Sequence, residues 1–336
     1  MISLVMLIAH SACHAQERDT IYMFNGQILI GQIRDANFGA LTIDEIDLKL
    51  QSIKLYKIKR LVIFHRFRIE TLDKRFLDGL LGPSEKEGWV NLYPANGVKE
   101  TIRIIHIFSL VPLDREFIKR VHGNISAGVS FSKSSNIGQV NFNGNAAFST
   151  RKVDYAAVAS EIGSIDTGKY SRDNEYIQLY AAYNLTPTWF LSAAAQYQRN
   201  LELSIGRRYL ELFGGGKKLV IKQTWELVAV TGISFTQEKS IAGETNGTSL
   251  EIPAMIRFDF FRFRDPDIQI TSIETLYYSL SEAGRVRFDG STSFSWQLVR
   301  YFYFKVSPYS NYDSKPPAAS KSNFDIGIVV SLSYKF

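Results

Sequence analysis

Cysteine is almost absent from this chain of 336 residues, with Cys13 as the only one. A fold that depends on disulfides or on a cysteine-rich metal site is therefore not expected. Long apolar runs are also missing, since no internal stretch reaches the roughly 18 apolar residues that a membrane-spanning helix needs. The formal net charge of +6 is small for this length and forms no long basic run. Nucleic-acid binding is therefore not expected either.

The C-terminal end of the chain, in contrast, has a regular pattern. Between Phe324 and Phe336 every second residue is apolar, the residues between them are small or polar, and Val329 is the one exception. A period of two over this length predicts a β-strand with one apolar and one polar face. The stretch resembles the C-terminal strand of bacterial outer-membrane barrels. That resemblance implies that Tyr334 and Phe336 belong to an assembly signal.

The same alternation recurs after Gly123. It is clear in residues 139–148, 177–185, 225–235 and 288–298. Such strands can span a membrane as a closed barrel, because each backbone group is paired between strands and every second side chain can face lipid. The polar face would then line the lumen. The candidate lumen-lining residues are Gln139, Asn141, Asn143, Gln178, Glu226, Arg257, Asp259, Glu274 and Gln297.

The connections between these strands alternate in length, and short periplasmic turns with longer outer loops are typical of outer-membrane barrels. Short turns are expected at residues 150–152, 185–188, 264–267 and 299–300, and longer polar loops at 166–174, 237–249 and 313–323. Counting from Gly123 gives about twelve strands. Residues 206–224 are the least regular part, because the glycines and lysines of 214–218 indicate a bulge or a turn, and a turn would change the count to ten or fourteen.

The N-terminus has the features of a secretory leader. Residues 1–9 form a short apolar run, and Cys13-His14-Ala15 fits the small-x-small pattern of a cleavage site. We therefore predict a signal peptide at residues 1–15, whose removal leaves a chain without cysteine. A lipoprotein anchored through Cys13 is the weaker alternative, because His10 stands where an aliphatic residue is expected.

Residues 16–122 repeat one pattern twice. Residues 21–31 are echoed by 69–79, an offset of 48, and the echo continues to about residue 110. Each unit has short strands and a tight turn, and Asn25-Gly26 is a strong hairpin signal. Units of this length bury little alone, so two are expected to pack together. They resemble Sm-like or SH3-like small barrels. The module is expected to be a periplasmic plug or collar, or else a platform for a partner.

The complete layout resembles the salt-induced outer-membrane protein family, a family of unknown function numbered 481. The resemblance rests on the leader, on the strand module with its Asn25-Gly26 turn, and on the barrel pattern that ends in Tyr334-Lys335-Phe336. It implies an outer-membrane barrel and supplies no catalytic residues. The doubled N-terminal unit departs from the simplest form of this layout.

Enzymatic activity is not expected. Outer-membrane phospholipases, omptin-type proteases and lipid-A deacylases use a histidine as general base, and no histidine follows His122. Four acids, Glu211, Glu226, Asp259 and Glu274, are expected in the lumen, where ion pairing with Arg257 explains them better than a glycosidase pair. No clustered ligands indicate a metal site, and residues 214–218 lack the spacing of a phosphate-binding loop. Catalytic residues, metal and cofactors are therefore all expected to be absent.

Aromatic residues near the predicted strand ends are expected to form interfacial girdles. They are Trp189, Trp225, Trp296, Tyr301 and Tyr303.

The sequence thus predicts an all-β protein, with a transmembrane antiparallel barrel of about twelve strands at residues 123–336 preceded by a two-repeat module at 16–122. The predicted location is the outer membrane of a Gram-negative cell. One functional hypothesis is a passive pore for small solutes, and the alternative is a barrel with a closed lumen whose module binds a periplasmic protein or the cell wall. Expected partners are outer-membrane lipid and the barrel assembly machinery, and nucleic acid is not among them.

Overall fold

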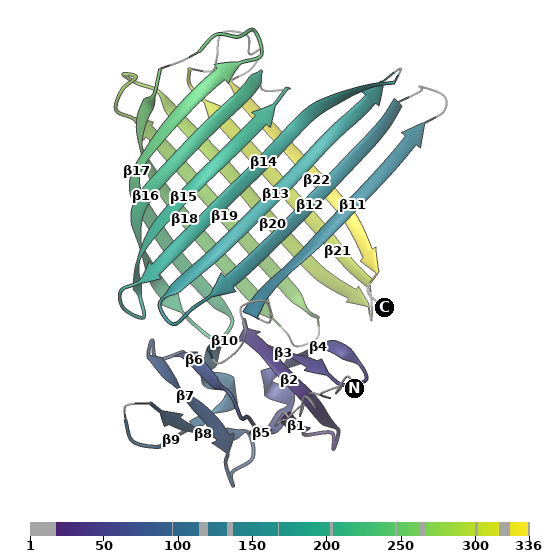
Figure 1. Cartoon of the computed structure of the whole chain (residues 1–336), viewed down its shortest axis with the longest axis vertical. Helices are drawn as coiled ribbons and strands as arrows, with labels where there is room; N and C mark the ends of the chain where they lie inside the picture. Colours follow the sequence, from purple (N-terminus) through teal and green to yellow (C-terminus); the bar gives the residue numbers. More distant parts are fainter. Residues whose placement is uncertain are drawn as a thin grey trace, which may run out of the picture.

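The computed structural model describes residues 18–95, 97–113, 120–132, 137–166, 168–201, 204–245, 247–262, 266–299, 302–315 and 323–334. Within these residues the chain forms two antiparallel sheets (Figure 1). No helix in this part of the chain is long and apolar enough to cross a membrane. The expected leader at residues 1–15 lies outside the described residues.

The first sheet, here called the N-terminal module, contains two copies of one strand arrangement. In each copy the fifth strand pairs with the first, so that β5 pairs with β1 and β10 pairs with β6. Strands β2 and β10 pair with each other and join the copies. The predicted repeat is visible in this order, while the likeness to Sm-like or SH3-like barrels remains a prediction. The first copy is β1 (Asp19–Met23), β2 (Ile28–Asn37), β3 (Ala40–Glu45), β4 (Lys49–Lys54), η1 (Leu55–Lys57) and β5 (Ile58–Val62); the second is β6 (Arg66–Thr71), β7 (Phe76–Pro83), β8 (Trp89–Pro94), β9 (Glu100–Arg103), η2 (Ile104–His106) and β10 (Ile107–Pro112).

Equivalent glycines permit close backbone contacts in the two copies. A Cβ atom on Gly31 would lie 2.3 Å from the carbonyl oxygen of Asp44, and a Cβ on Gly79 would lie 2.3 Å from that of Tyr93. Gly26, in the predicted Asn-Gly turn, has a φ of +87°, which side chains disfavour. The close backbone contact explains why glycine recurs at positions 31 and 79. The position that matches Gly26 is Lys74, which has a φ of +63°.

Apolar side chains from both copies meet in a single core. Ile33 and Leu41 of the first copy and Phe67 and Leu92 of the second are all 0% exposed. A unit of about 48 residues has too much surface for its volume to fold stably alone. The shared core therefore explains why the two copies form one module.

The second sheet, here called the C-terminal sheet, is a meander in which each strand pairs with the next along the chain. It rolls up, with β11–β16 in front and β18–β22 behind in Figure 1. The described residues contain twelve strands in this sheet, as predicted. They are β11 (Val121–Ser132), β12 (Ile137–Ser149), β13 (Val153–Asp166), β14 (Lys169–Asn184), β15 (Trp189–Asn200), β16 (Ile205–Ile221), β17 (Trp225–Ser240), β18 (Ser249–Arg262), β19 (Ile268–Ser279), β20 (Val286–Val299), β21 (Phe302–Asp313) and β22 (Phe324–Tyr334).

The connections agree with the sequence pattern in most places. The turns at residues 150–152 and 185–188 are confirmed, and the glycines and lysines of 214–218 lie inside β16, where pairing with β17 shifts register after Lys218. The long loop expected at 166–174 is wrong, since β13 extends to Asp166 and β14 begins at Lys169. That segment is polar on both faces, so composition alone suggested a loop. Parts of the segments 264–267, 299–300 and 313–323 lie outside the described residues.

The two faces of the rolled sheet differ in exposure. In β17 the residues from Glu226 to Ser240 alternate, with even-numbered side chains mostly buried and odd-numbered ones more exposed. We call the buried side the concave face and the other side the convex face. The convex face carries large exposed apolar residues, including Ile233, Ile256 and Leu276.

The predicted closure of the barrel is not observed. Within the described residues the strand order runs from β11 to β22 and no ladder joins these two strands. The sheet is therefore rolled but open along one seam. Concave residues of β12 beside this seam, such as Gln139 and Asn145, are exposed as a result.

Candidate functional site

Strand β6 of the module directs two charged side chains toward the C-terminal sheet. Phe67 and Ile69 lie in the module core, so the alternation of a strand places Arg68 and Glu70 on the opposite face. These two side chains are nevertheless buried, with exposed fractions of 7% and 4%. Their burial results from contact with the other sheet.

Each of these residues forms an ion pair with the concave face of the C-terminal sheet. Arg68 Nη2 lies 2.6 Å from Oδ1 of Asp154, and Arg68 Nη1 donates to the carbonyl oxygen of Thr150 at 2.8 Å. Lys218 Nζ donates to both carboxylate oxygens of Glu70, at 2.7 and 2.8 Å. We call these two ion pairs the latch, because they hold the module at one end of the rolled sheet.

Two more ion pairs flank the latch. Lys54 Nζ lies 2.8 Å from Oδ2 of Asp267, and Arg151 Nη2 lies 2.6 Å from Oδ2 of Asp78. The Arg151 side chain is 67% exposed, so water screens its pair and the expected contribution is small. Both flanking pairs add ionic contacts between the module and the C-terminal sheet.

The electrostatics of the latch are dominated by burial. Burial raises the pKa of the Glu70 carboxyl, and the Lys218 ammonium opposes that rise. Desolvation of two buried charges offsets much of their attraction, whereas removing one partner strands the other at a cost of about 3–5 kcal/mol. The latch is therefore sensitive to the loss of either member.

Aromatic packing adds an apolar contact beside the latch. Phe38 of the module packs on Phe261 of the C-terminal sheet with ring centroids 4.8 Å apart. Phe108 meets Phe38 edge-on at 6.1 Å, and Ile221 completes the buried cluster. Both kinds of contact, ionic and apolar, therefore join the two sheets.

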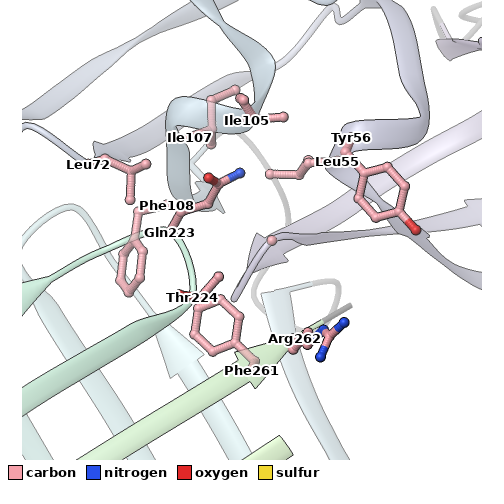
Figure 2. Close-up of a pocket in the computed structure, with 11 residues that line it drawn as sticks. Leu55, Tyr56, Leu72, Ile105, Ile107, Phe108, Gln223, Thr224, Phe261 and Arg262 are labelled. Carbon is pink, nitrogen blue, oxygen red and sulfur yellow. The ribbon is translucent and has the colours of Figure 1, made fainter. Parts of the chain in front are cut away.

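A cavity of about 360 Å³ lies at this junction (Figure 2). This is within the size range of small-molecule sites, which are mostly apolar with a few polar groups. Gln223, Tyr56 and Arg262 supply such groups. The lining residues are Gly39, Leu55, Tyr56, Leu72, Ile105, Ile107 and Phe108 from the module, with Gln223, Thr224, Phe261 and Arg262 from the C-terminal sheet and its turns. The cavity can hold an apolar group, and no cluster of three His, Cys, Asp or Glu side chains suited to a metal exists within the described residues.

Three charged residues lie near the latch on the concave face. Arg257 Nε donates to Asp259 Oδ2 at 2.7 Å, and Thr271 donates to the other oxygen of Asp259 at 2.9 Å. Glu226 is 7% exposed, and its Oε1 accepts no hydrogen bond from any described residue. The mouth of the rolled sheet next to the module is thus strongly polar.

A second ionic network occupies the concave face at the opposite end. Arg285, only 1% exposed, lies 3.1 Å from Glu238 and 2.7 Å from Asp313. Arg287 Nε donates to Glu251 Oε1 at 2.9 Å, and Glu251 is 0% exposed. Side chains therefore fill this end of the rolled sheet along β16–β21.

The comparison with family models agrees with the sequence resemblance. A family model described as "Protein of unknown function, DUF481" matches residues 125–336. The chain belongs to the DUF481 family. A search of curated proteins gave no match to this DUF481 chain. Among solved structures it is similar to a bacterial polysaccharide outer membrane secretin at 8% identity, over 75% of this chain and 92% of that one, with a TM-score of 0.38.

Eight of the nine candidate lumen-lining residues of this DUF481 chain separate into three groups. Glu226, Arg257 and Asp259 come together near the latch, and the others on the concave face are Gln139, Gln178 and Gln297. The side chains of Asn141 and Asn143 lie outside the described residues, as do the side chain of Tyr334 and the whole of Phe336.

Glu274 contradicts its prediction. It lies opposite Ile256 on the convex face and is followed by buried Thr275. Ser272 Oγ donates to its Oε1 at 2.9 Å. Glu211 also lies on the convex face, opposite Phe235.

The predicted girdle residue Tyr303 lies on the concave face, opposite Gln297, and Tyr301 lies outside the described residues. Alternation separates the two faces of a strand without saying which one is concave, which explains these errors.

Sequence reasoning missed the latch. Lys218 was counted only as part of an irregular glycine and lysine stretch, and Arg68, Glu70 and Asp154 were not singled out. Lys218 and Glu70 are 148 positions apart in the sequence. The alternation of the charged residues Arg68 and Glu70 with apolar Phe67 and Ile69 was the one available signal.

Proposed function

We propose that the protein is an outer-membrane β-barrel whose periplasmic mouth is closed by the N-terminal module. The observation that carries the membrane part is a pair of aromatic belts on the convex face. Phe302 and Tyr312 are ten residues apart on β21, which is about 25 Å along the membrane normal at about 3.3 Å per residue and a tilt of about 40°. This equals the height of the apolar band of such barrels. The belt near the module contains Tyr155, Tyr183, Trp189, Trp225, Trp296 and Phe302, and the far belt contains Tyr170, Tyr197, Tyr209, Tyr278, Tyr312 and Phe324.

In a membrane the open seam must close. Unpaired backbone groups cost several kcal/mol each in hydrocarbon, so an open sheet edge is not tolerated there. Successive strands of the meander run in opposite directions, and an even number of strands lies between β11 and β22. These two strands are therefore antiparallel. Exposed Ile125 and Val129 of β11 and Ile328 and Val330 of β22 place an apolar convex face on both sides of the seam. Pairing of β22 with β11 is therefore part of the proposal.

The connections support one orientation of the chain in the membrane. The module lies at the end that carries the turns 150–152 and 185–188, and short turns face the periplasm in outer-membrane barrels. The module would accordingly be periplasmic, and the far-end ionic network would lie near the cell surface. A chain exported by an N-terminal signal peptide and inserted by the barrel assembly machinery fits this arrangement.

The function that the junction supports best is a small-solute channel that is plugged from the periplasm. The latch holds Arg68 and Glu70 against the concave residues Asp154 and Lys218. Twelve-stranded barrels are intermediate between small barrels that side chains fill and wide porins. Release of the module would open the mouth, so the latch would serve as the gate. No catalytic step is part of this proposal.

A barrel with a permanently closed lumen is the second candidate, because the network around Arg285 and Glu251 fills the far end. In that case the module would be a binding platform for a periplasmic protein or the cell wall. The two candidates differ in conductance but share the same topology.

Topology is tested by labelling in intact Gram-negative cells. Single cysteines would replace Ala242, in the connection between β17 and β18, or Val98, which is 83% exposed on the module, in a chain with Cys13 replaced. A membrane-impermeant maleimide is expected to label Ala242→Cys in intact cells and Val98→Cys only after the outer membrane is permeabilised. Equal labelling of both variants in intact cells would contradict the proposed orientation.

A further inference from the structure

Three cations form a row across the convex face at the end far from the module. Arg199 lies on β15, Arg207 on β16 and Lys239 on β17, and Arg207 lies directly opposite Lys239 in the register. The neighbouring Arg208 is buried on the concave face, where its Nε donates to Glu238 at 2.7 Å. Alternation therefore places Arg207 on the convex side.

The pair of Arg207 and Lys239 is unfavourable by itself. Like charges directly opposite each other in an antiparallel sheet repel. Among the ion pairs of the described residues, none includes either of these two side chains. An anion between them would replace the repulsion with two attractions.

Arg199 extends the row and is held in place. Its Nε donates to the carbonyl oxygen of Arg172 at 2.9 Å, and its Nη1 donates to the carbonyl oxygen of Gly206 at 3.0 Å. Glu175, opposite Arg199 in the register, already accepts from Arg172 at 3.2 Å and from the Tyr197 hydroxyl at 3.0 Å. The nearby carboxylate is thus engaged by other donors.

The row lies immediately beyond the far aromatic belt. The rings of Tyr197 and Tyr209 have centroids 5.5 Å apart, and Arg207 is two residues beyond Tyr209 on the same face of β16. Aromatic belts mark the headgroup level of a membrane. The cations would therefore be at the depth of the lipid phosphates.

We propose that Arg199, Arg207 and Lys239 bind the phosphate of an anionic lipid headgroup in the outer leaflet. This inference rests on the proposed membrane placement. Guanidinium groups recognise phosphate through paired N–H donors, and the tyrosine rings would contact the lipid beneath its headgroup. The ligand is a membrane lipid and not free phosphate, because the row lies on the convex face, next to the apolar band that would contact lipid.

The test uses the full chain in phosphatidylcholine nanodiscs that contain a small fraction of phosphatidic acid. The lipid retained with the protein is quantified by mass spectrometry at several phosphatidic acid fractions. The variant Arg207→Gln/Lys239→Gln removes the opposed pair. The matched control, Lys152→Gln/Lys217→Gln, removes two cations near the other belt, which lie over Tyr183 and Trp189 at 5.9 and 4.7 Å.

Loss of the opposed pair is expected to move half-saturation of the test variant to a roughly 30-fold higher phosphatidic acid fraction. The control should shift half-saturation far less, because Lys152 and Lys217 lie over aromatic rings and do not form an opposed pair. Inorganic phosphate should not displace the lipid. Equal retention by the test variant and the wild type, or full displacement by inorganic phosphate, would overturn the lipid site. Heat-modifiable gel mobility of the same samples reports insertion. A chain that fails to insert overturns the membrane placement as well, whereas insertion with unchanged retention overturns the lipid site alone.

Discussion

Substitution of Lys218 by methionine tests the latch most sharply. Methionine has a similar length and no charge, so the change removes the two hydrogen bonds of 2.7 and 2.8 Å to Glu70 and little volume. Glu70 is 4% exposed and would remain buried without its cation. Breaking a buried pair in this way costs about 3–5 kcal/mol. At 1.4 kcal/mol per factor of ten, the docking equilibrium of the module should fall by roughly 100- to 4,000-fold.

Docking can be measured by pulsed electron resonance between two spin labels. Val98→Cys on the module and Leu185→Cys in a turn of the C-terminal sheet are both exposed, and replacement of Cys13 leaves no other thiol. The docked chain should give one narrow distance distribution, and Lys218→Met should add a broad, longer component that grows with urea at lower concentrations than in the wild type.

Two further variants complete the test. Lys217→Met is the matched control, because Lys217 is adjacent in sequence but lies over Trp189 on the convex face. The double variant Glu70→Gln/Lys218→Met removes both charges and should recover most of the docking, since no unpaired ion stays buried. If Lys218→Met docks as well as Lys217→Met, the reasoning about the latch is refuted.

Three other expectations follow from the same structure. Burial raises the pKa of Glu70 above its ordinary 4.5 in the docked form. Docking should therefore be strongest below about pH 4.5 and should weaken as the pH rises through the raised pKa. If the pH dependence of docking is the same in Glu70→Gln, this expectation is contradicted. Phe67→Ala should lower the free energy of unfolding of the module by about 3–5 kcal/mol in urea titrations, because Phe67 is 0% exposed in the shared core; a change below 1 kcal/mol would exclude that core. In lipid, the amides of β11 and β22 should exchange with deuterium as slowly as those of β17, since closure pairs both edges; fast exchange confined to the two edge strands would show an open seam.

Much of the architecture could be predicted from local pattern. The alternation in residues 225–235 and 324–336 identified strands because a period of two survives any tertiary context in which one face is buried. The turn at 185–188 and the repeat of residues 21–31 at 69–79 were likewise local signals. These features depend on neighbours in sequence, which a single chain displays directly.

The candidate site depended on distant contacts and was largely hidden. Alternation placed Glu226 and Asp259 on one face correctly, yet it assigned Glu274 to the wrong face because a polar residue was taken as evidence of the lumen. In the structure Glu274 is accommodated on the convex face by hydrogen bonds from Ser272 and Thr292. The pairing of Lys218 with Glu70 required knowing how the two sheets meet. No periodicity in either segment encodes that contact.

The most direct test of a module-capped channel is conductance of the full chain in a planar bilayer. It would be compared with the variant Arg68→Ala/Lys218→Ala, which removes one member of each latch pair, after folding of both is verified by heat-modifiable gel mobility. We expect the wild type to be silent or nearly so, and the variant to show repeated openings as the module leaves the mouth. The same steady current in both proteins would contradict the cap, and silence in both would contradict the channel.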